Sequence, residues 1–214
     1  MNLPGPGRSG REAEHSVRIG IVASQGGFEA HAKALRSLGA EPVEVRVAAQ
    51  LEGLDGLVIP GGESTTISKA LARDGLDTAI GEFAGAGGAI FGTCAGMIVL
   101  DRSHLGLLDV EAERNAFGRQ RQSFEHELEV VGLGPEPLRA VFIRAPWVAE
   151  RGPGVEVLAA YEGHPVVVRE GRMLACSFHP ELTDDSRLHA LFVAIAESGA
   201  DDDRNTREAR ALSD

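Results

Sequence analysis

Short β-branched runs alternate with helix-like stretches over the first hundred residues of the chain. The runs VRIGIVA, PVEVRV, DGLVIP and GGAIFG are separated by segments such as FEAHAKALRSLG and STTISKALARDG, and a further apolar helix starts after the last run. This order is typical of βαβ units, in which parallel strands form a sheet with helices on both faces. The pattern therefore predicts an α/β fold.

From about Leu107 strand-like runs follow one another without helices between them. Gly, Pro and acidic turns separate them, among them Glu162-Gly163 and Glu170-Gly171. Strands joined by such short turns pair antiparallel, so the second half should contain antiparallel pairs. The expected strands are LLDVEAE, FEHELEVVGL, LRAVFIRA, VEVLAAY, PVVVRE and RMLACSF.

The chain is expected to form one domain between two flexible tails. Its 214 residues suffice for one well-buried core. Residues 1–16 are rich in Gly, Pro and charge and can bury little apolar surface, and residues 199–214 are again charged and poor in apolar anchors. An amphipathic helix at about 184–197 should pack against the sheet before the second tail. The predicted domain is residues 17–198.

Composition narrows the classes of function. With 32 acidic against 21 basic side chains, the formal net charge is −11, which repels phosphate backbones and anionic lipid, so neither nucleic acid nor a membrane is an expected partner. Two distant cysteines form neither a disulfide framework nor a zinc pattern. The first residues lack the apolar core of a signal peptide. We therefore expect a cytoplasmic protein that needs no metal.

The segment GGAIFGTCAGMIVL carries the most informative motif. An apolar strand runs into residues 92–96, Gly-Thr-Cys-Ala-Gly, and then into a helix, the pattern of a nucleophile elbow with cysteine in the place of serine. The glycines allow the sharp turn that exposes Cys94, and the helix N-terminus favours an anion, so a thiolate there would be reactive near neutral pH. The alternative is a buried cysteine in a tight turn. Cys176, in the middle of a strand, is expected only to pack.

A base for this nucleophile is predicted in Phe178-His179-Pro180-Glu181. Proline disfavours helix for the residue before it, so His179 should be extended, and residues two apart in an extended segment point the same way. The Glu181 carboxylate would then bond one ring nitrogen of His179 and leave the other free to accept a proton from a thiol. Alone, the tripeptide would more often be a surface turn. An elbow cysteine in the same chain favours the catalytic pair.

The other histidines do not fit this role. His15 falls in the N-terminal tail. The remaining ones are interpreted as exposed or helix-face residues without a fixed carboxylate partner: His104, His126, His164 and His189.

A glycine-rich loop, Pro60-Gly61-Gly62-Glu63-Ser64-Thr65-Thr66, follows the strand GLVIP and opens a helix. Two glycines allow unusual backbone angles, so peptide N–H groups can converge on one point as an oxyanion hole. Alternatively, the loop is a simple turn with Ser64 or Thr65 as the helix N-cap. A phosphate-binding loop is disfavoured because no lysine follows the glycines.

Together these motifs resemble a known family. GTCAG, PGGESTT and FHPELTDD are similar to the motifs of class I, triad-type glutamine amidotransferases, and ERNAFGRQ and FIRAP resemble more specifically the glutaminase subunit of pyridoxal 5'-phosphate synthase. The resemblance runs from about Val17 to Glu197. It implies a single-domain class I glutamine amidotransferase fold, with a mixed, mostly parallel central sheet and helices on both faces.

The resemblance also implies roles for the matching residues. The implied catalytic triad is Cys94, His179 and Glu181. The implied substrate contacts are Gly62, Glu63, Ser64, Arg114, Ile143 and Arg144. The implied oxyanion residues are Gly61, Ala95 and Gln25, the last of which would shape the region when a partner docks. A guanidinium suits a substrate carboxylate because its fork matches two oxygens, although either arginine alone would be read as a surface ion pair. His31 matches a family E-x-H motif, and both an exposed helix position and an interface role are open for it.

By this resemblance, the cysteine attacks the side-chain amide of L-glutamine, a γ-glutamyl thioester forms, and the ammonia passes to the synthase subunit in a hetero-oligomeric complex that makes pyridoxal 5'-phosphate. No cofactor is required in the glutaminase subunit. Three alternatives remain open: a glutaminase subunit of another synthase, a non-catalytic regulatory subunit, and a cysteine protease or esterase on a related scaffold.

Overall fold

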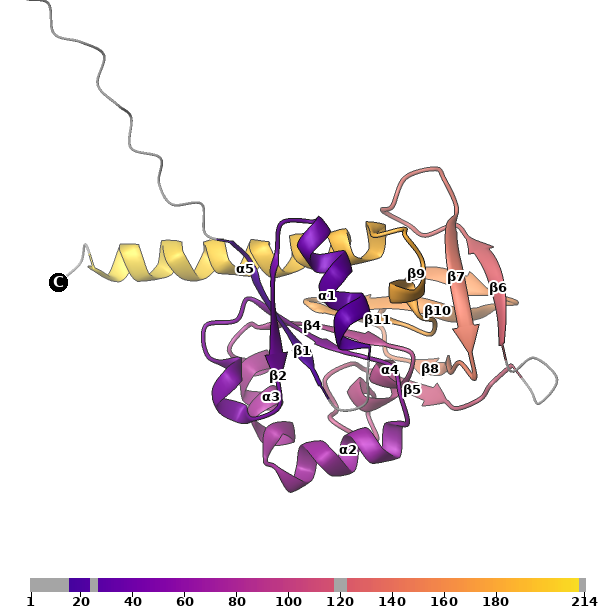
Figure 1. The fold of residues 1–214 in the computed structure, drawn as a ribbon, viewed down its shortest axis with the longest axis horizontal. Helices are drawn as coiled ribbons and strands as arrows, with labels where there is room; N and C mark the ends of the chain where they lie inside the picture. Colours follow the sequence, from indigo (N-terminus) through magenta and orange to yellow (C-terminus); the bar gives the residue numbers. More distant parts are fainter. Residues whose placement is uncertain (1–15, 24–26, 118–122, 212–214) are drawn as a thin grey trace, which may run out of the picture.

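A seven-stranded sheet forms the centre of the protein (Figure 1). The computed structural model describes residues 16–23, 27–117 and 123–211, with side chains through residue 199. In sheet order the strands are β2 (Glu41–Val45), β1 (Arg18–Val22), β3 (Gly56–Ile59), β4 (Ala89–Thr93), β11 (Met173–Cys176), β10 (His164–Glu170) and β9 (Glu156–Tyr161). Neighbours from β2 to β11 run parallel, whereas β10 is antiparallel to β11 and to β9. The predicted mixed, mostly parallel sheet is confirmed.

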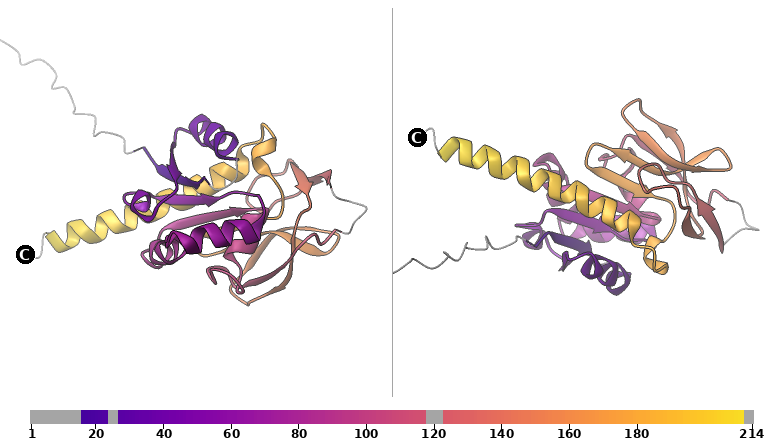
Figure 2. Two further views of the ribbon diagram at one scale, coloured as in Figure 1. Left: turned by 60° about the horizontal axis from the view of Figure 1, so that its bottom comes forward. Right: turned by 90° about the horizontal axis from the view of Figure 1, so that it is seen from above.

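Helices lie on both faces of this sheet, as predicted (Figure 2). One hydrophobic core lies under α1 (Phe28–Ser37) and α5 (Arg187–Ala211). The other lies under α2 (Ser64–Arg73), α3 (Leu76–Gly85) and α4 (Ala95–Leu100). Because successive strand residues point to opposite faces, β4 contributes Phe91 to the first core and Ile90 to the second. Two short 3-10 helices complete the chain, η1 (Ala48–Leu51) and η2 (Pro180–Leu182).

Two small antiparallel sheets extend the second half. One pairs β5 (Val110–Glu113) with β8 (Trp147–Arg151), and the other pairs β6 (Ser123–Leu128) with β7 (Leu138–Ile143). The antiparallel pairs expected beyond Leu107 are therefore present.

Two elements were not predicted from the sequence. Strand β8 buries a single apolar side chain, Val148, and so gives no apolar run. Helix α3 contains Gly81 and Gly85, which lower helix propensity. Burial of Leu76 and Ile80 against the sheet offsets that cost.

The last helix is longer than predicted. Helix α5 runs to Ala211 and extends past the body of the protein (Figure 1), so residues 199–211 are helical where a flexible tail was expected. The physical reason is that a helix already nucleated by packing adds one hydrogen bond for each further residue, and the segment contains no proline. The predicted N-terminal tail lies outside the described residues, except for Ser16. Within the ranges given above, no helix is both long and apolar enough to cross a bilayer.

Candidate active site

Cys94 sits at the sharp turn between β4 and α4. Its backbone has φ 49° and ψ −107°, outside the ordinary regions for a non-glycine residue. Glycine is needed on both sides of it: a Cβ on Gly96 would lie 2.0 Å from the Ile59 carbonyl oxygen, and one on Gly92 would lie 2.7 Å from the Gly96 carbonyl. The predicted elbow geometry is therefore present. The predicted exposure of Cys94 is wrong, because the residue is only 6% exposed and its Sγ lies 3.8 Å from the Ile143 carbonyl oxygen.

His179 reaches Cys94 because β11 pairs in parallel with β4. The Cys94 N–H donates to the Cys176 carbonyl at 2.8 Å, which ties the two strand ends together. His179 follows β11 directly, and its own N–H donates to the Val141 carbonyl at 2.9 Å. Its imidazole lines the same cavity as Cys94, and the Cys94 side chain is close enough to raise the pKa of His179.

Glu181 bonds the other side of the His179 ring. The distance from Glu181 Oε1 to His179 Nδ1 is 2.8 Å, so Nδ1 is occupied and Nε2 is the ring nitrogen that remains for the thiol. The predicted contact is present, although its cause differs from the expected one. Glu181 belongs to η2 rather than to an extended segment, and the 3-10 turn brings its carboxylate back to the ring.

The His179 ring holds its proton strongly. Burial alone would lower its pKa, but hydrogen bonds and charge interactions with Cys94 and Glu181 outweigh burial and raise the pKa to about 10. For Glu181, burial raises the pKa, whereas the hydrogen bond from His179 and the neighbouring imidazoles lower it, with a net lowering. At neutral pH the site therefore holds the Glu181 carboxylate, the His179 imidazolium and the Cys94 sulfur side by side.

A cavity of about 300 Å³ opens beside Cys94 and His179, a size at the small end of ligand pockets. The other predicted residues that line it are Gly62, Glu63, Ser64, Ala95, Arg114, Ile143 and Arg144. Lining residues that were not singled out from the sequence are Ile98, Asn115 and Pro146. The last two belong to the ERNAFGRQ and FIRAP motifs, so those motifs were the available signal.

Gly61 lies against the catalytic ring. A Cβ at this position would come within 2.5 Å of His179 Cε1 and 3.3 Å of Cys94 Cβ, so only glycine fits. The next residue, Gly62, has φ 151°, which L-residues rarely adopt. Gln25, the third predicted oxyanion residue, lies outside the described residues.

Backbone strain concentrates around the cavity. Among the described non-glycine residues, Cys94, Asn115 and Arg144 have positive φ, and all three line this cavity. The fourth such residue, Glu162, lies in the turn between β9 and β10. Residues held in sparsely populated conformations cluster at functional sites, because the surrounding fold must stabilise them for a purpose.

Glu63 caps helix α2. Its carboxylate accepts from the N–H groups of Thr65 at 3.0 Å and Thr66 at 2.8 Å, and from the Thr66 hydroxyl at 2.6 Å. These hydrogen bonds, led by the Thr66 hydroxyl, lower the pKa of Glu63 to about 2. The N-cap is thus Glu63 rather than the Ser64 or Thr65 considered as alternatives. The cap fixes the loop that carries the two glycines.

Arg114 is held over the cavity by neighbours on two sides. Its Nη1 donates to the Thr65 hydroxyl at 3.0 Å, and its Nη2 donates to His104 Nε2 at 3.2 Å. Because a guanidinium only donates, the His104 proton sits on Nδ1 and is donated to Asp101 Oδ1 at 2.7 Å. The prediction that His104 lacks a carboxylate partner is therefore wrong. Asp101 precedes it by three residues in the turn after α4, a spacing that could have indicated the pair.

His31 and His189 lie behind Glu181, and both are fully buried. The exposed position considered for His31 is wrong, and the interface role considered for it stays a prediction. His189 lies on a helix, as one of its two interpretations had it, but on the buried side of α5. His31 Nε2 is 3.4 Å from Glu181 Oε2. Helical spacing was the available signal, because His31 and Leu35 are four residues apart and share the buried face of α1.

Cys176 contrasts with Cys94. It is fully buried in the sheet, and its Sγ lies 3.4 Å from the Phe178 carbonyl oxygen. Burial raises the pKa of the Cys176 thiol, and the nearby Glu181 charge adds to the effect. Its interpretation as a packing residue is confirmed. Within the described segments, no three His, Cys, Asp or Glu side chains gather as a metal site requires.

Comparisons with known proteins find glutamine amidotransferases by family, by sequence and by structure. Residues 21–198 match the SNO glutamine amidotransferase family. The chain is 51% identical over 184 residues to the pyridoxal 5'-phosphate synthase subunit PdxT of Niallia circulans, covering 83% of this chain and 96% of the relative. It is 53% identical over 190 residues to the PdxT subunit of Frankia alni, covering 85% and 96%. A crystal structure of a glutamine amidotransferase aligns with a TM-score of 0.79 and 48% identity, covering 84% of this chain and 98% of the other.

Proposed function

The chain belongs to the SNO glutamine amidotransferase family, and from that premise we propose that Cys94, His179 and Glu181 are the triad with which it hydrolyses L-glutamine. Its enzymatic class is that of a glutaminase subunit. The observation that carries the residue assignment is the line from Glu181 Oε1 through His179 to Cys94 at the wall of the small cavity.

In the first half-reaction, Cys94 Sγ attacks the side-chain amide carbon of glutamine. The oxyanion that forms is held by the N–H of Ala95, at the free N-terminus of α4, and by N–H groups of the Gly61-Gly62 turn. His179 donates its proton to the nitrogen as the C–N bond breaks, which yields ammonia and a γ-glutamyl thioester. The raised pKa of His179 keeps that proton available at neutral pH.

In the second half-reaction, the neutral His179 takes a proton from water. The hydroxide attacks the thioester, the C–S bond breaks, and glutamate leaves. The thiolate that reappears restores the charge that raises the pKa of His179. Glu181 holds the ring in one orientation through both halves.

The two arginines suit the α-carboxylate of glutamine. Thr65 and His104 take two of the five N–H donors of Arg114 and fix its plane. Arg144 and Ile143 line the same cavity as Arg114. Glu63 contributes through the loop that it caps, together with Ser64.

The protein acts with a synthase subunit, and we propose that this partner is the pyridoxal 5'-phosphate synthase subunit of the PdxS family. The support is the name shared by the curated relatives, each a subunit of that synthase. The ammonia would pass within a hetero-oligomeric complex, with Gln25 shaping the oxyanion region when the partner docks. The cytoplasmic location stays a prediction from the sequence.

Glutamate release tests this function. We expect the purified wild-type chain to release glutamate from glutamine when the synthase subunit is added, and Cys94→Ala to release none under the same conditions. Cys176→Ala is the matched control, because it removes the other thiol of the chain. Absence of turnover in a demonstrated wild-type complex would overturn the proposal and favour a regulatory subunit.

A further inference from the structure

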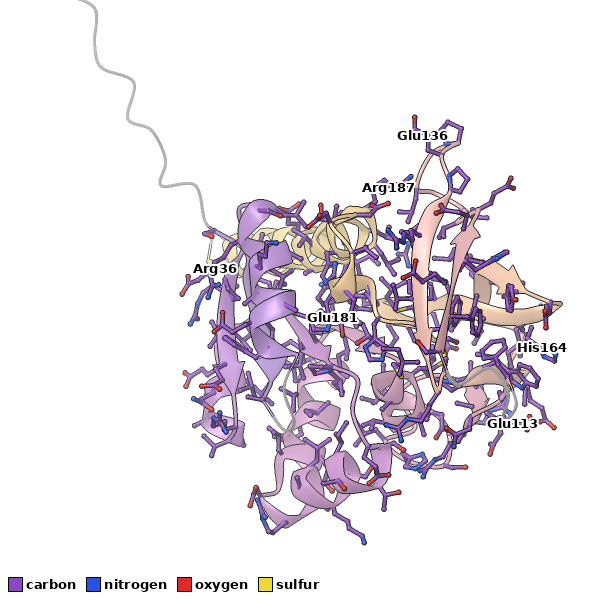
Figure 3. The ribbon with its side chains drawn as sticks, turned by 45° about the vertical axis from the view of Figure 1, so that its right-hand side comes forward. Arg36, Glu113, Glu136, His164, Glu181 and Arg187 are labelled. Carbon is purple, nitrogen blue, oxygen red and sulfur yellow. The ribbon has the colours of Figure 1, made fainter. Side chains whose placement is uncertain are left out.

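Two buried histidines stand behind the proposed triad and take no part in its chemistry. His31 comes from α1 and His189 from α5, the two helices that cover one face of the sheet. Glu181 lies against α1 (Figure 3), with its carboxylate between the His179 ring on one side and the His31 ring on the other. A fully buried imidazole costs free energy unless its nitrogen atoms have hydrogen-bond partners. The partners of the two rings therefore indicate what the pair does.

The contacts link the two rings to the carboxylate in a row. His31 Nδ1 and His189 Nε2 are 2.9 Å apart. His31 Nε2 is 3.4 Å from Glu181 Oε2 and 3.5 Å from the Thr93 hydroxyl. In the described part of the chain, neither His189 Nδ1 nor Glu181 Oε2 has a hydrogen-bond partner, so the 3.4 Å approach of His31 Nε2 to Oε2 is a longer polar contact and not a hydrogen bond.

Each ring carries a single proton. Burial lowers the pKa of His31, and it lowers that of His189 to about 3, so both imidazoles are neutral at physiological pH. One proton on each ring leaves two consistent ways to form the bond between them, and the surroundings of the row distinguish these two ways.

In the first arrangement, His31 would donate from Nδ1 to His189. The bare Nε2 of His31 would then face the Glu181 carboxylate, and the His189 proton would sit on Nδ1, where it meets no acceptor. An unpaired buried N–H is costly, and so is a lone pair set against a carboxylate.

In the second arrangement, each proton lies beside an acceptor atom. His189 Nε2–H donates to His31 Nδ1, and His31 Nε2–H has the Thr93 hydroxyl at 3.5 Å and the Glu181 Oε2 charge at 3.4 Å. The atom left without a partner, His189 Nδ1, is then only a lone pair, which is the cheaper group to leave unpaired.

We propose that His31 is a positioning residue for Glu181, and that His189 holds it in the tautomer with the proton on Nε2. This inference rests on the proposed function of Glu181. Oε1 is hydrogen-bonded to His179, and Oε2 has the His31 Nε2–H as its polar neighbour at 3.4 Å, so the two rings lie against the two oxygens of the carboxylate. A fixed carboxylate holds the His179 ring in the orientation that the reaction needs.

Enzyme kinetics in the complex with the synthase subunit test the role of His31. His31→Leu should lower kcat for glutamine about tenfold, the effect of one lost polar contact to a charged group, while KM stays unchanged. His31→Gln should regain most of the rate, because its side-chain N–H₂ can take the place of Nε2–H. Equal rates for the two variants, or wild-type kcat in His31→Leu, would overturn the proposal.

A packing control separates positioning from general loosening of the core. Phe192→Leu changes a fully buried ring of α5 in the same core, without touching Glu181. We expect this variant to lose thermal stability and keep kcat. A tenfold loss of kcat in Phe192→Leu at a similar melting temperature would count against a specific role for His31.

Nitrogen-15 NMR of the histidine rings tests the tautomers without any activity. At pH 7 the resonances lost in His31→Gln and in His189→Leu should both be those of neutral rings protonated on Nε2. A neutral His31 ring protonated on Nδ1 would overturn this inference and leave the proposed function intact. A wild-type complex that releases no glutamate would overturn the proposed function, whatever the tautomers.

Discussion

Glu181 is contacted by a histidine on each side, and the two sides behave in opposite ways. On the front side, His179 Nδ1 lies 2.8 Å from Oε1, and the pKa of His179 is raised to about 10. On the back side, His31 Nε2 lies 3.4 Å from Oε2, and the pKa of His31 is lowered. We call Cys94 and His179 the front pair, and His31 and His189 the back pair.

The difference shows that a carboxylate neighbour does not by itself set the proton affinity of a histidine. Burial opposes the imidazolium form on both sides. On the front side, Cys94 supplies a second group that favours the imidazolium, whereas on the back side the second neighbour is the neutral His189. The same side chain therefore holds a proton for transfer in one place and serves as a neutral donor in the other.

Removing the front histidine should have the largest effect. His179→Gln takes away the group that donates the proton to ammonia, and we expect kcat to fall by about 10⁴-fold or more. Single-turnover glutamate release in the complex measures it. The comparison fails if His31→Leu reduces kcat by as much, because the two pairs would then be equivalent.

A smaller loss should follow when the front ring is displaced rather than removed. In Gly61→Ala the new Cβ would lie 2.5 Å from His179 Cε1, so the ring has to move. A misplacement of that kind can cost about 10²-fold in kcat.

The matched control for this substitution is Gly81→Ala in α3, where an added Cβ meets nothing within 4 Å. It should leave kcat unchanged and raise the free energy of unfolding by about 0.5–1 kcal/mol. An equal loss of kcat in both variants would contradict the steric account.

The front pair and the back pair should change the free energy of unfolding with pH in opposite directions. The folded pKa of His179 lies above the unfolded value of 6.5, so its contribution is complete below pH 6.5 and is lost as pH rises toward 10. The folded pKa of His189 lies near 3, so stability falls as pH drops from 6.5 toward 3, where the unfolded chain takes up the proton.

Urea unfolding from pH 4 to pH 10 measures both slopes. The total change in the free energy of unfolding that each histidine causes is on the order of a few kcal/mol at most. His179→Gln should flatten the alkaline side of the curve, and His189→Leu should flatten the acid side. If each variant flattens the opposite side, the assignment of charge to the two pairs is wrong.

The smallest effect should come from the second cysteine. Cys176 lies beside the front pair, but it is fully buried and burial raises the pKa of its thiol. Cys176→Ala should change kcat by less than about twofold, since the substitution removes only packing atoms. Mass spectrometry after exposure to a glutamine-like electrophile should find Cys94 modified and Cys176 intact. Modification of Cys176 in the folded chain would break the contrast.

Local sequence patterns predicted most of the fold and the front pair of the site. Alternating strand and helix runs predicted the parallel strands with helices on both faces, since each run of apolar residues reflects the burial of its own element. The elbow could be predicted because Gly92, Cys94 and Gly96 stand together in one strand-to-helix motif, even though the close contact at Gly96 is made by the distant Ile59. The His179–Glu181 contact was predicted from spacing, even though η2 rather than an extended segment produces it.

The back pair could not be predicted in this way. His31 and His189 are separated by 158 positions and meet only because α1 and α5 cover the same face of the sheet. Local periodicity reports that a residue faces a core, but not which distant residue it meets there. The helical end of α5 was missed for a related reason, because its composition is that of a tail while its start is fixed by distant packing.

The pairing of β4 with β11 also orders events during synthesis. Cys94 emerges from the ribosome long before His179, because residues 95–172 are made between the two strands. A nascent or prematurely terminated chain therefore carries the elbow thiol without its base, and closing the central gap in the sheet waits for one of the last strands to be made.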